Sequence, residues 1–470
     1  MTALFAAPSL LLASADAHHV DMSTTLLFSA LLVGLIACLA LEEKIHAKKS
    51  IIVGCFAVVV LLAGIATHVI PGTASVTVGG ETLILPVYIP GIDWGVIAII
   101  LGSSLFVDVT SKTGLFTWIA IKLTKASGGD PRKLLWFYGL MTVVFSAVLN
   151  NVTAMIIVGS LTGVSLRKLE RDKLLLGFLL TEGLLTNVGG LLTLISSVPN
   201  IIVGTAAGIS FVQFFVAAAP YVVLGTIVTI LMGAKFFGID KLADDKERAT
   251  AAEQVAGFDE KDGIDSWSFF YFGVGMLLLF IIVIATTSVL PWVSELGMGF
   301  VAMTFAVIML VRYKSSVDTY YKAVDWDLLG FFVGLFIVIN VMEHAAVLTL
   351  IGKGLSVIID LGDTTGTALI LVSAAFASSV TDNIPLAAML AKILSALNTP
   401  SDSPLWWSVV FGANLGGNIT PIGSASTLVA VTIMHKNDLK VSFADFVKKA
   451  IPFAGVQLVM AMAYVLLVLR

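Results

Sequence analysis

Charge is scarce in this chain. Of its 470 residues, 12% are Asp, Glu, Lys or Arg and 58% are hydrophobic, which gives a mean hydropathy of +1.01. Soluble domains carry about a quarter of charged residues, so this composition excludes a soluble domain and predicts a polytopic membrane protein in contact with lipid. The net charge of −4, without a basic patch, also excludes a nucleic-acid partner.

Cysteines and catalytic motifs are scarce too. The two cysteines, Cys38 and Cys55, both lie in apolar stretches, so we expect two small core residues rather than a disulfide or a metal pair. The His and Cys residues do not have the spacing of a zinc site. Because the sequence also shows no nucleophile–base pair and no phosphate-binding loop, we expect neither enzyme activity nor a cofactor beyond a coupling ion.

The apolar residues are gathered in long stretches. About 20 such residues cross a bilayer as a helix, and the stretches that reach or approach this length are 25–42, 50–70, 94–110, 174–206, 211–235, 267–290, 296–312, 326–343, 405–434 and 451–469. Two further stretches, 133–168 and 364–399, are interrupted in the middle by polar residues. The sequence therefore predicts an all-α polytopic membrane protein with about ten spans and two re-entrant helical hairpins. Residues 1–24 contain a candidate signal peptide, although no Lys or Arg precedes its apolar run.

The basic residues of short loops predict the orientation, because such loops stay in the cytoplasm. Residues 43–49 carry three lysines and are expected inside, whereas 71–92 lack Lys and Arg and are expected outside, with a β-hairpin at Gly79-Gly80. Basic residues flank hairpin 133–168 on both sides, and acidic residues flank hairpin 364–399. We therefore expect the first hairpin to enter from the inside, the second from the outside, and both termini to lie outside a cytoplasmic (inner) membrane.

The chain reads as two halves that repeat each other in opposite membrane orientations. Both copies open with Asp-Trp, continue with a hairpin and a glycine-broken span, and end with a closing span. Such inverted repeats are typical of secondary active transporters, although a gated ion channel stays open as an alternative. The predicted organisation is scaffold spans and an outside loop at 25–91, a first repeat at 92–236 (hairpin 133–168, broken helix 174–206), a cytoplasmic linker with two linking spans at 237–323, and a second repeat at 324–470 (hairpin 364–399, broken helix 405–434).

Polar motifs mark the hairpin tips and the broken spans. The tips read Asn150-Asn151-Val152-Thr153 and Thr381-Asp382-Asn383-Ile384-Pro385, and both broken spans contain Asn-X-Gly-Gly. Paired glycines let the backbone leave helical geometry. The freed carbonyls, with Asn, Ser and Thr oxygens, suit sodium, while helix N-termini suit an anion or a neutral oxyacid. The alternative is that the glycines serve close helix packing. The predicted substrate- or ion-binding residues are Asn150, Asn151, Thr153, Asn187, Gly189, Gly190, Thr193, Ser197, Thr381, Asp382, Asn383, Asn414, Gly416, Gly417, Asn418, Thr420 and Ser424.

Two carboxylates lie within apolar segments and are candidates for proton coupling. An ionisable group at membrane depth costs a few kcal/mol and usually faces a cavity, a partner or an ion. Asp382, at the second hairpin tip, is the stronger candidate, and Glu182, before Asn187 in the first broken span, is the second. Each has a structural alternative, as a helix cap or a hydrogen-bonded core residue.

At these motifs the sequence resembles the ion transporter superfamily, in particular the branch of arsenite permeases, sodium–proton antiporters and the P protein, with its citrate-transporter-like domain. Four elements match the pattern in order: Leu149–Thr153, the run 187–200, Asp382–Pro385 and Gly412–Ser426. The sequence departs from the branch at Asn150, which stands where the branch often has Asp, at Ser196-Ser197-Val198-Pro199, and at Thr420-Pro421.

The resemblance implies a dimerising scaffold domain and a transport domain that moves as an elevator. It also implies sodium sites between each hairpin tip and the facing broken helix, one with Asn151 and Thr153 and the other with Thr381 and Asn383. We therefore expect a homodimeric secondary transporter that couples a proton or sodium gradient to antiport or efflux of a small inorganic ion, such as sodium/proton exchange or arsenite-type oxyacid export. The second hypothesis is a sodium-coupled carboxylate or sulfate symporter.

Overall fold

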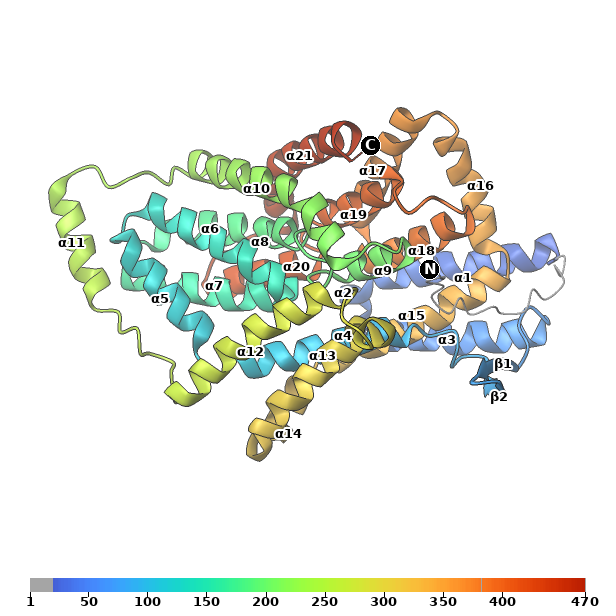
Figure 1. The fold of residues 1–470 in the computed structure, drawn as a ribbon. Helices are drawn as coiled ribbons and strands as arrows, with labels where there is room; N and C mark the ends of the chain where they lie inside the picture. Colours follow the sequence, from blue (N-terminus) through green and yellow to red (C-terminus); the bar gives the residue numbers. More distant parts are fainter. Residues whose placement is uncertain (1–19, 382, 470) are drawn as a thin grey trace. The chain divides into compact units, whose positions relative to one another are not determined.

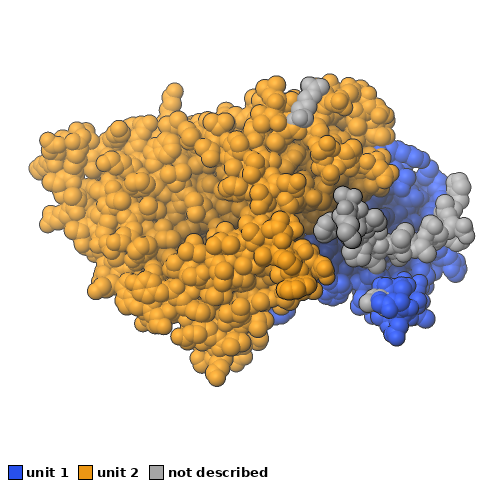
Figure 2. Space-filling view, viewed as in Figure 1, with its two compact units in different colours: residues 1–97, 326–354 blue, residues 98–325, 355–470 orange. Residues whose placement is uncertain are grey.

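The computed structural model describes residues 20–381 and 383–469, and the chain divides into two compact units (Figures 1 and 2). Unit 1 is formed by residues up to Ile97 together with Trp326–Gly354, and unit 2 by Ala98–Asp325 together with Leu355 onward. The candidate signal peptide lies outside the described residues. The units cut across the repeat, because the second copy begins with a helix that belongs to unit 1.

Unit 1 is a small helical bundle with a β-hairpin. Its elements are α1 (Met22–Ala40), α2 (Glu42–Ile45), α3 (Lys49–Ala66), β1 (Thr73–Val78), β2 (Glu81–Pro86) and α15 (Trp326–His344). Helix α3 packs along α15, and the Ser50 hydroxyl donates to Asp327 Oδ1 at 2.5 Å where the two helices begin. Gly79 and Gly80 both have positive φ, as a two-residue hairpin loop requires, so the expected β-hairpin is confirmed.

Unit 2 holds both hairpins and both broken spans. Its helices are the greater part of α4 (Trp94–Ser111) and the last turn of α16 (Val347–Ile359), with α5 (Leu115–Ser127), α6 (Pro131–Val148), α7 (Asn151–Lys168), η1 (Asp172–Leu174), α8 (Leu175–Gly189), α9 (Val198–Ala206), α10 (Phe211–Phe236), α11 (Asp245–Ala256), α12 (Trp267–Thr286), α13 (Val293–Arg312), η2 (Lys314–Ser316), α14 (Val317–Ala323), α17 (Asp363–Val380), α18 (Asn383–Ala396), α19 (Pro404–Gly416), α20 (Ala425–Lys436) and α21 (Phe443–Leu467).

The helices of the two copies correspond one to one, from α4–α10 to α15–α21. The correspondence includes α5 and α16, two short amphipathic helices that the sequence analysis did not predict. Helix α21 begins earlier than the predicted span at 451–469, because Ser442 and Asp445 form a capping box ahead of Pro452. Its counterpart α10 begins with the same device, formed by Ser210 and Gln213.

Hairpins and broken spans pack crosswise within unit 2. Helices α6 and α7 pack on α8, and α17 and α18 pack on α19; these two groups lie at opposite ends of the unit (Figure 1). The second halves of the broken spans then cross over, since α9 packs on α18 of the second hairpin and α20 packs on α7 of the first. Each hairpin is thus held by both copies of the repeat.

The length and surface of the helices fit a membrane. Among the described residues, nine helices are long and apolar enough to cross a bilayer. The broken spans are not among them because each is divided into two shorter helices. Large apolar side chains point outward from these helices, for example Leu62, Ile282 and Val459, which are 65%, 59% and 67% exposed. Such a surface is stable in contact with lipid.

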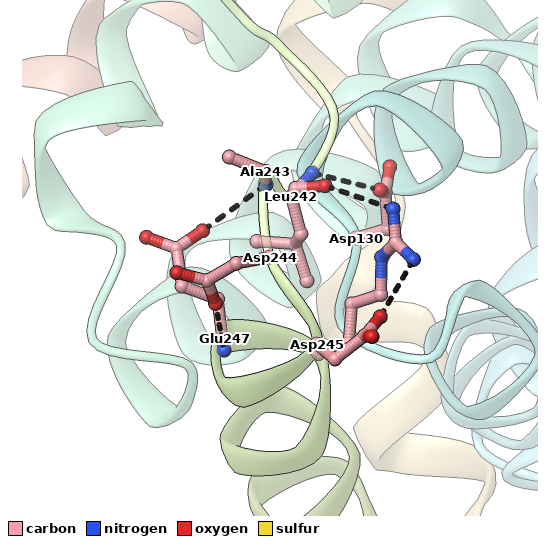
Figure 3. Close-up of polar contacts among 7 residues, drawn as sticks. Asp130, Leu242, Ala243, Asp244, Asp245 and Glu247 are labelled. Atoms are coloured by element: carbon pink, nitrogen blue, oxygen red, sulfur yellow. Dashed lines mark hydrogen bonds and ion pairs between the residues drawn. The ribbon is translucent and has the colours of Figure 1, made fainter.

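The linker between the halves is attached to the root of the first hairpin (Figure 3). Asp130 caps α6 by accepting from Lys133 N at 2.9 Å, and its other oxygen accepts from Leu242 N at 3.1 Å. Arg248 donates to Leu242 O at 3.4 Å and to Asp245 at 3.0 Å. The polar stretch is therefore helical in part, as α11, and fixed at one end to α6.

Candidate functional site: an amide and hydroxyl centre between two broken helices

The first hairpin tip is a two-residue turn that places an amide against the broken span. Leu149 and Asn150 are extended, and the Asn150 side chain caps α7 by accepting from Thr153 N at 2.8 Å. Asn151 then starts α7 and donates to Asn187 Oδ1 at 3.3 Å. A Cβ added at Gly190 would collide with the Asn151 amide, so this glycine is required for the approach.

The second hairpin tip is described on both sides of Asp382, which itself lies outside the described residues. Thr381 is extended and its hydroxyl donates back to Ala377 O at 2.8 Å, so it satisfies its own helix. Asn383 starts α18 and is buried, with 7% of its side chain exposed. The proton-coupling role predicted for Asp382 therefore stays a prediction.

Each hairpin is joined to its broken span by two matching hydrogen bonds. Ser146 donates to Thr186 O at 2.6 Å, and its counterpart Ser378 donates to Ala413 O at the same distance. These carbonyls lie in the last turns of α8 and α19, and Thr186 O also accepts from Gly190 N at 2.8 Å. The two serine bonds occupy corresponding positions, so both copies join hairpin and broken span in the same way.

The second matching pair joins the break to the hairpin. Thr193 donates to Ala147 O and Thr420 donates to Ser379 O, both at 2.5 Å. The acceptors lie in the last turns of α6 and α17, so these threonines satisfy the unpaired carbonyls at the hairpin tips. Thr193 and Thr420, both predicted as ion-binding residues, therefore join the broken spans to the hairpins.

Two crossed pairs of Asn and Ser connect the copies. Asn187 of the first broken span donates to Ser424 Oγ of the second at 3.0 Å. In the corresponding contact of the repeat, Ser197 of the first broken span donates to Asn414 Oδ1 of the second at 2.7 Å. All four residues are buried. We call Asn187, Asn414, Ser197, Ser424 and Asn418 the crossed amide centre.

The fifth member of the centre links it to the closing helices. Asn418 accepts from Asn187 Nδ2 at 2.8 Å and donates to Leu184 O and to Gln457 Oε1, at 3.1 and 2.8 Å. Gln457, on α21, donates in turn to Thr229 on α10 at 2.9 Å. Gln457 was not among the predicted residues, although a lone amide in the apolar span 451–469 was the signal that could have revealed it.

The glycines of the broken spans allow the helices to touch. A Cβ at Gly189 would lie 2.7 Å from Val143 Cα on α6, and a Cβ at Gly416 would lie 2.7 Å from Ala375 Cα on α17. Gly417 lies against Ser424 in the same way, with 2.9 Å to Ser424 Cβ. Close helix packing, the alternative role predicted for these glycines, is thus one of their functions. The same packing brings the polar groups of the centre together.

The centre is built from neutral side chains. Its amides and hydroxyls bond to one another, and helices α7, α9 and α20 begin at or beside it. Helix N-termini carry partial positive charge from unpaired N–H groups. The arrangement offers oxygen ligands for a small cation and N–H groups for an anion, without a fixed charge on the five residues of the centre.

Glu182 lies apart from the centre, on the same helix as Asn187. Its side chain is fully buried, and one oxygen accepts from the Thr162 hydroxyl on α7 at 2.7 Å. Glu182, the second candidate for proton coupling, thus points from α8 toward α7 of the first hairpin. Its coupling role stays a prediction.

Unit 2, with its hairpins, broken helices and buried polar centre, defines a multi-pass membrane transporter. The profile of the citrate transporter family matches residues 55–412. The chain belongs to this family, which lies within the ion transporter superfamily, and the predicted superfamily is thereby confirmed. The protein is therefore a secondary transporter.

Relatives and a solved structure agree with this class. The chain is 31% identical to a 46 kDa membrane protein of Mycobacterium leprae, over 80% of this chain and 86% of that protein. It is 24% identical to the P protein of Sus scrofa, over 84% of this chain and 55% of that protein. The YdaH transporter of Alcanivorax borkumensis shares the fold, with a TM-score of 0.60 at 12% identity over 89% of this chain and 98% of the other.

Proposed function

We propose that this chain couples a proton or sodium gradient to the movement of a small inorganic ion across the cytoplasmic membrane. The observation that carries the proposal is the crossed amide centre, a buried site that two inverted copies build with equivalent bonds. A site with pseudo-twofold symmetry presents similar walls to both faces of a membrane, which alternating access requires.

The proposed cargo is a small ion exchanged for protons or sodium, either sodium itself or an arsenite-type oxyacid. Oxygens of Asn151, Thr153 and the Gly189-Gly190 stretch would hold one sodium ion, and those of Thr381, Asn383 and the 416–420 stretch another. Hard cations prefer such oxygen ligands. Asp382 would bind a proton and an ion in alternation, and unit 2 would carry the site as an elevator in a homodimer.

A carboxylate is the second candidate cargo. Three helices, α7, α9 and α20, begin at or beside the centre, and their N-terminal N–H groups suit an oxyanion. The family's description as a citrate transporter supports the same candidate. In this case sodium would accompany the carboxylate in the same direction instead of exchanging with it.

Proteoliposomes with an entrapped pH dye would test both candidates. Sodium, lithium, arsenite, citrate and succinate are added in turn against an imposed proton gradient, with Asn187→Ala, Asn414→Ala and Asp382→Asn as variants. Removing one partner of a buried hydrogen bond costs about 1–3 kcal/mol, so we expect each Asn→Ala variant to lose about 5- to 150-fold in apparent affinity. Asn398→Gly, at an exposed position with φ of 52°, is the matched control.

The pattern of responses separates the candidates. Proton movement on adding sodium, lithium or arsenite that is lost in Asp382→Asn supports exchange of an inorganic ion. A response to citrate or succinate alone, dependent on sodium, supports the carboxylate. Currents that do not saturate with concentration would contradict a carrier and favour a channel.

A further inference from the structure

Glu182 is held in a place that leaves half of its carboxyl group without a partner. The residue is fully buried in α8, and Thr162 donates to Oε1 at 2.7 Å. The second oxygen, Oε2, is buried and has no hydrogen-bond partner among the described residues. A buried ionised carboxylate with one hydrogen bond and no cation is strongly unfavourable, so the side chain carries a proton in this conformation.

The second copy of the repeat shows that the fold does not need this acid. The matching bonds of Ser146 and Ser378 align Thr186 with Ala413, and one turn earlier they align Glu182 with Val409. Helices α7 and α18 can be aligned in the same way at their first residues, Asn151 and Asn383. In this alignment Leu394 of the second copy corresponds to Thr162 of the first.

Val409 and Leu394 are both fully buried, at 0% exposure. An apolar pair therefore fills the corresponding place in the second copy. Because replacing buried polar groups with apolar ones of similar size is often neutral or stabilising, the acid in the first copy needs a reason other than stability.

A row of hydroxyl groups leads toward Glu182 through the first hairpin. The Tyr138 hydroxyl on α6 bonds to Thr124 Oγ1 on α5 at 2.8 Å and to Ser165 Oγ on α7 at 2.7 Å. Ser165 lies one turn from Thr162 on the same face of α7, so the two hydroxyls are neighbours. A hydroxyl can accept one proton while it donates another, and Ile370 stands at the position of Tyr138 in the second copy.

Few other titratable groups face Glu182. Among the described residues, Tyr138 on α6 is the one whose charge would act on it, and Thr162 is its hydrogen-bond partner. The Lys and Arg residues of α6, α7 and α10 lie in terminal turns, as do His435 and Lys436 of α20. The lysines of η1 and α21 lie at a helix start or within two turns of one, and α19 contains no Lys or Arg.

We propose that Glu182 is a proton-binding site of the first repeat, distinct from the crossed amide centre, and that it exchanges its proton with water through Thr162, Ser165 and Tyr138. On release, the carboxyl group turns so that its O–H donates to the Thr162 hydroxyl, the O–H bond breaks, and the electron pair stays on the carboxylate. The Thr162 hydroxyl accepts this proton and passes its own to Ser165, and Tyr138 passes a proton on to water in the same way. This inference rests on the proposed function for its role in coupling, while proton binding itself does not depend on the cargo.

Infrared difference spectroscopy on the purified full-length protein in nanodiscs tests proton binding directly. The carbonyl stretch of a protonated carboxylic acid is recorded as the pH is raised. We expect a band that is lost in Glu182→Gln. The band should be kept in Asp382→Asn and in the control Glu253→Gln, at an exposed position of α11. Thr162→Val is expected to shift the band and Thr162→Ser to restore it, because the hydroxyl donates to the carboxyl group.

Transport gives a second readout. With proteoliposomes and gradients of sodium, arsenite or citrate as probes, Glu182→Gln should lower proton movement about 100-fold, as loss of a proton-transferring group does, while probe binding changes by less than about twofold. An infrared band that survives in Glu182→Gln overturns the proposal whatever the transport result. Proteoliposomes that move no protons for any probe, with the band still assigned to Glu182, would overturn the coupling role and the proposed proton exchange but leave the proton site standing.

Discussion

Asn187 and Asn414 hold the centre together through residues of the opposite copy. Each amide bonds to a serine that begins the second half of the other broken span, Ser424 for Asn187 and Ser197 for Asn414. The two serines differ in a second duty. Ser424 also caps α20 by accepting from Thr427 N at 3.3 Å, whereas the Ser197 side chain does not cap α9. The pseudo-symmetric pair therefore contributes unequally to stability.

This difference gives a prediction for alanine substitutions. Ser197→Ala leaves Asn414 Oδ1 without its donor and should lower the free energy of unfolding by about 1–2 kcal/mol. Ser424→Ala should lower it by about 1 kcal/mol more, because a helix cap is lost as well. Thermal unfolding followed by tryptophan fluorescence in detergent measures both, with the exposed Ser395→Ala as control. Equal losses would show that the Ser424 cap adds no stability, and no loss in either variant would show that the crossed bonds contribute none.

At the scale of elements, the sequence predicted the hairpins and broken spans as motifs but not how they cross. Paired glycines and a polar interruption are visible locally, so a break near 187–200 could be expected. The packing of α9 on α18 and of α20 on α7 depends on tertiary contacts that no local pattern records. Helices α5 and α16 were missed because each has 13 residues, too few to span a bilayer. The attachment of the linker to α6 was also not predicted, because it too depends on a tertiary contact. The polar residues of the linker would suit a solvated loop equally well.

The segment between α11 and α12 carries a prediction of pH dependence. Glu260 pairs with Lys122 Nζ at 2.5 Å and with Lys125 Nζ at 3.3 Å, and both lysines lie on α5. The hydrogen bond from Lys122, together with that from Lys125, lowers the pKa of the Glu260 carboxyl below its usual value. A lowered pKa in the folded state means that the contact stabilises the loop above the ordinary pKa of Glu and that this contribution is lost as pH falls through the lowered pKa.

Limited proteolysis of the loop at 257–266 checks the sign. Cleavage should be slow near neutral pH, faster as the pH falls through the acid range, and already fast at neutral pH in Glu260→Gln. High salt should have the same effect as acid, because the pair is exposed and screened. Asp262→Asn, an exposed neighbour, is the control. Cleavage that is independent of pH in the unmodified protein would contradict the ion pair.

At the scale of the whole chain, the repeat could be read from the sequence but its asymmetry could not be interpreted from it. The motifs aligned Asn150 with Asp382 and Asp93 with Asp325, and Ser146 and Ser378, which the same alignment pairs, make matching bonds to the broken spans. The departures from symmetry carry the specific functions proposed here. Glu182 faces Thr162 in one copy, and Gln457 stands against Asn418 in the other. Such differences gain meaning only when the equivalent contacts are known.

The last prediction concerns the opposite membrane orientations that the sequence predicts for the two copies. Lys and Arg residues keep loops in the cytoplasm, so the roots of the two hairpins should face opposite sides of the membrane. We expect a cysteine at Glu170, at the end of the first hairpin, to react with a membrane-impermeant maleimide only after the membrane is opened. A cysteine at Asp402, after the second hairpin, should react in intact cells, as should one at Glu81 in the β-hairpin.

The background for this experiment is the variant in which Cys38 and Cys55 are replaced by alanine, since both are free thiols. Glu170, Asp402 and Glu81 are all exposed, so a lack of reaction reports sidedness and not burial. Labelling of Glu170→Cys and Asp402→Cys from the same side would mean that the hairpins enter from one face. The crossed amide centre would then join two parallel copies, and alternating access through an inverted repeat would have no structural basis in this chain.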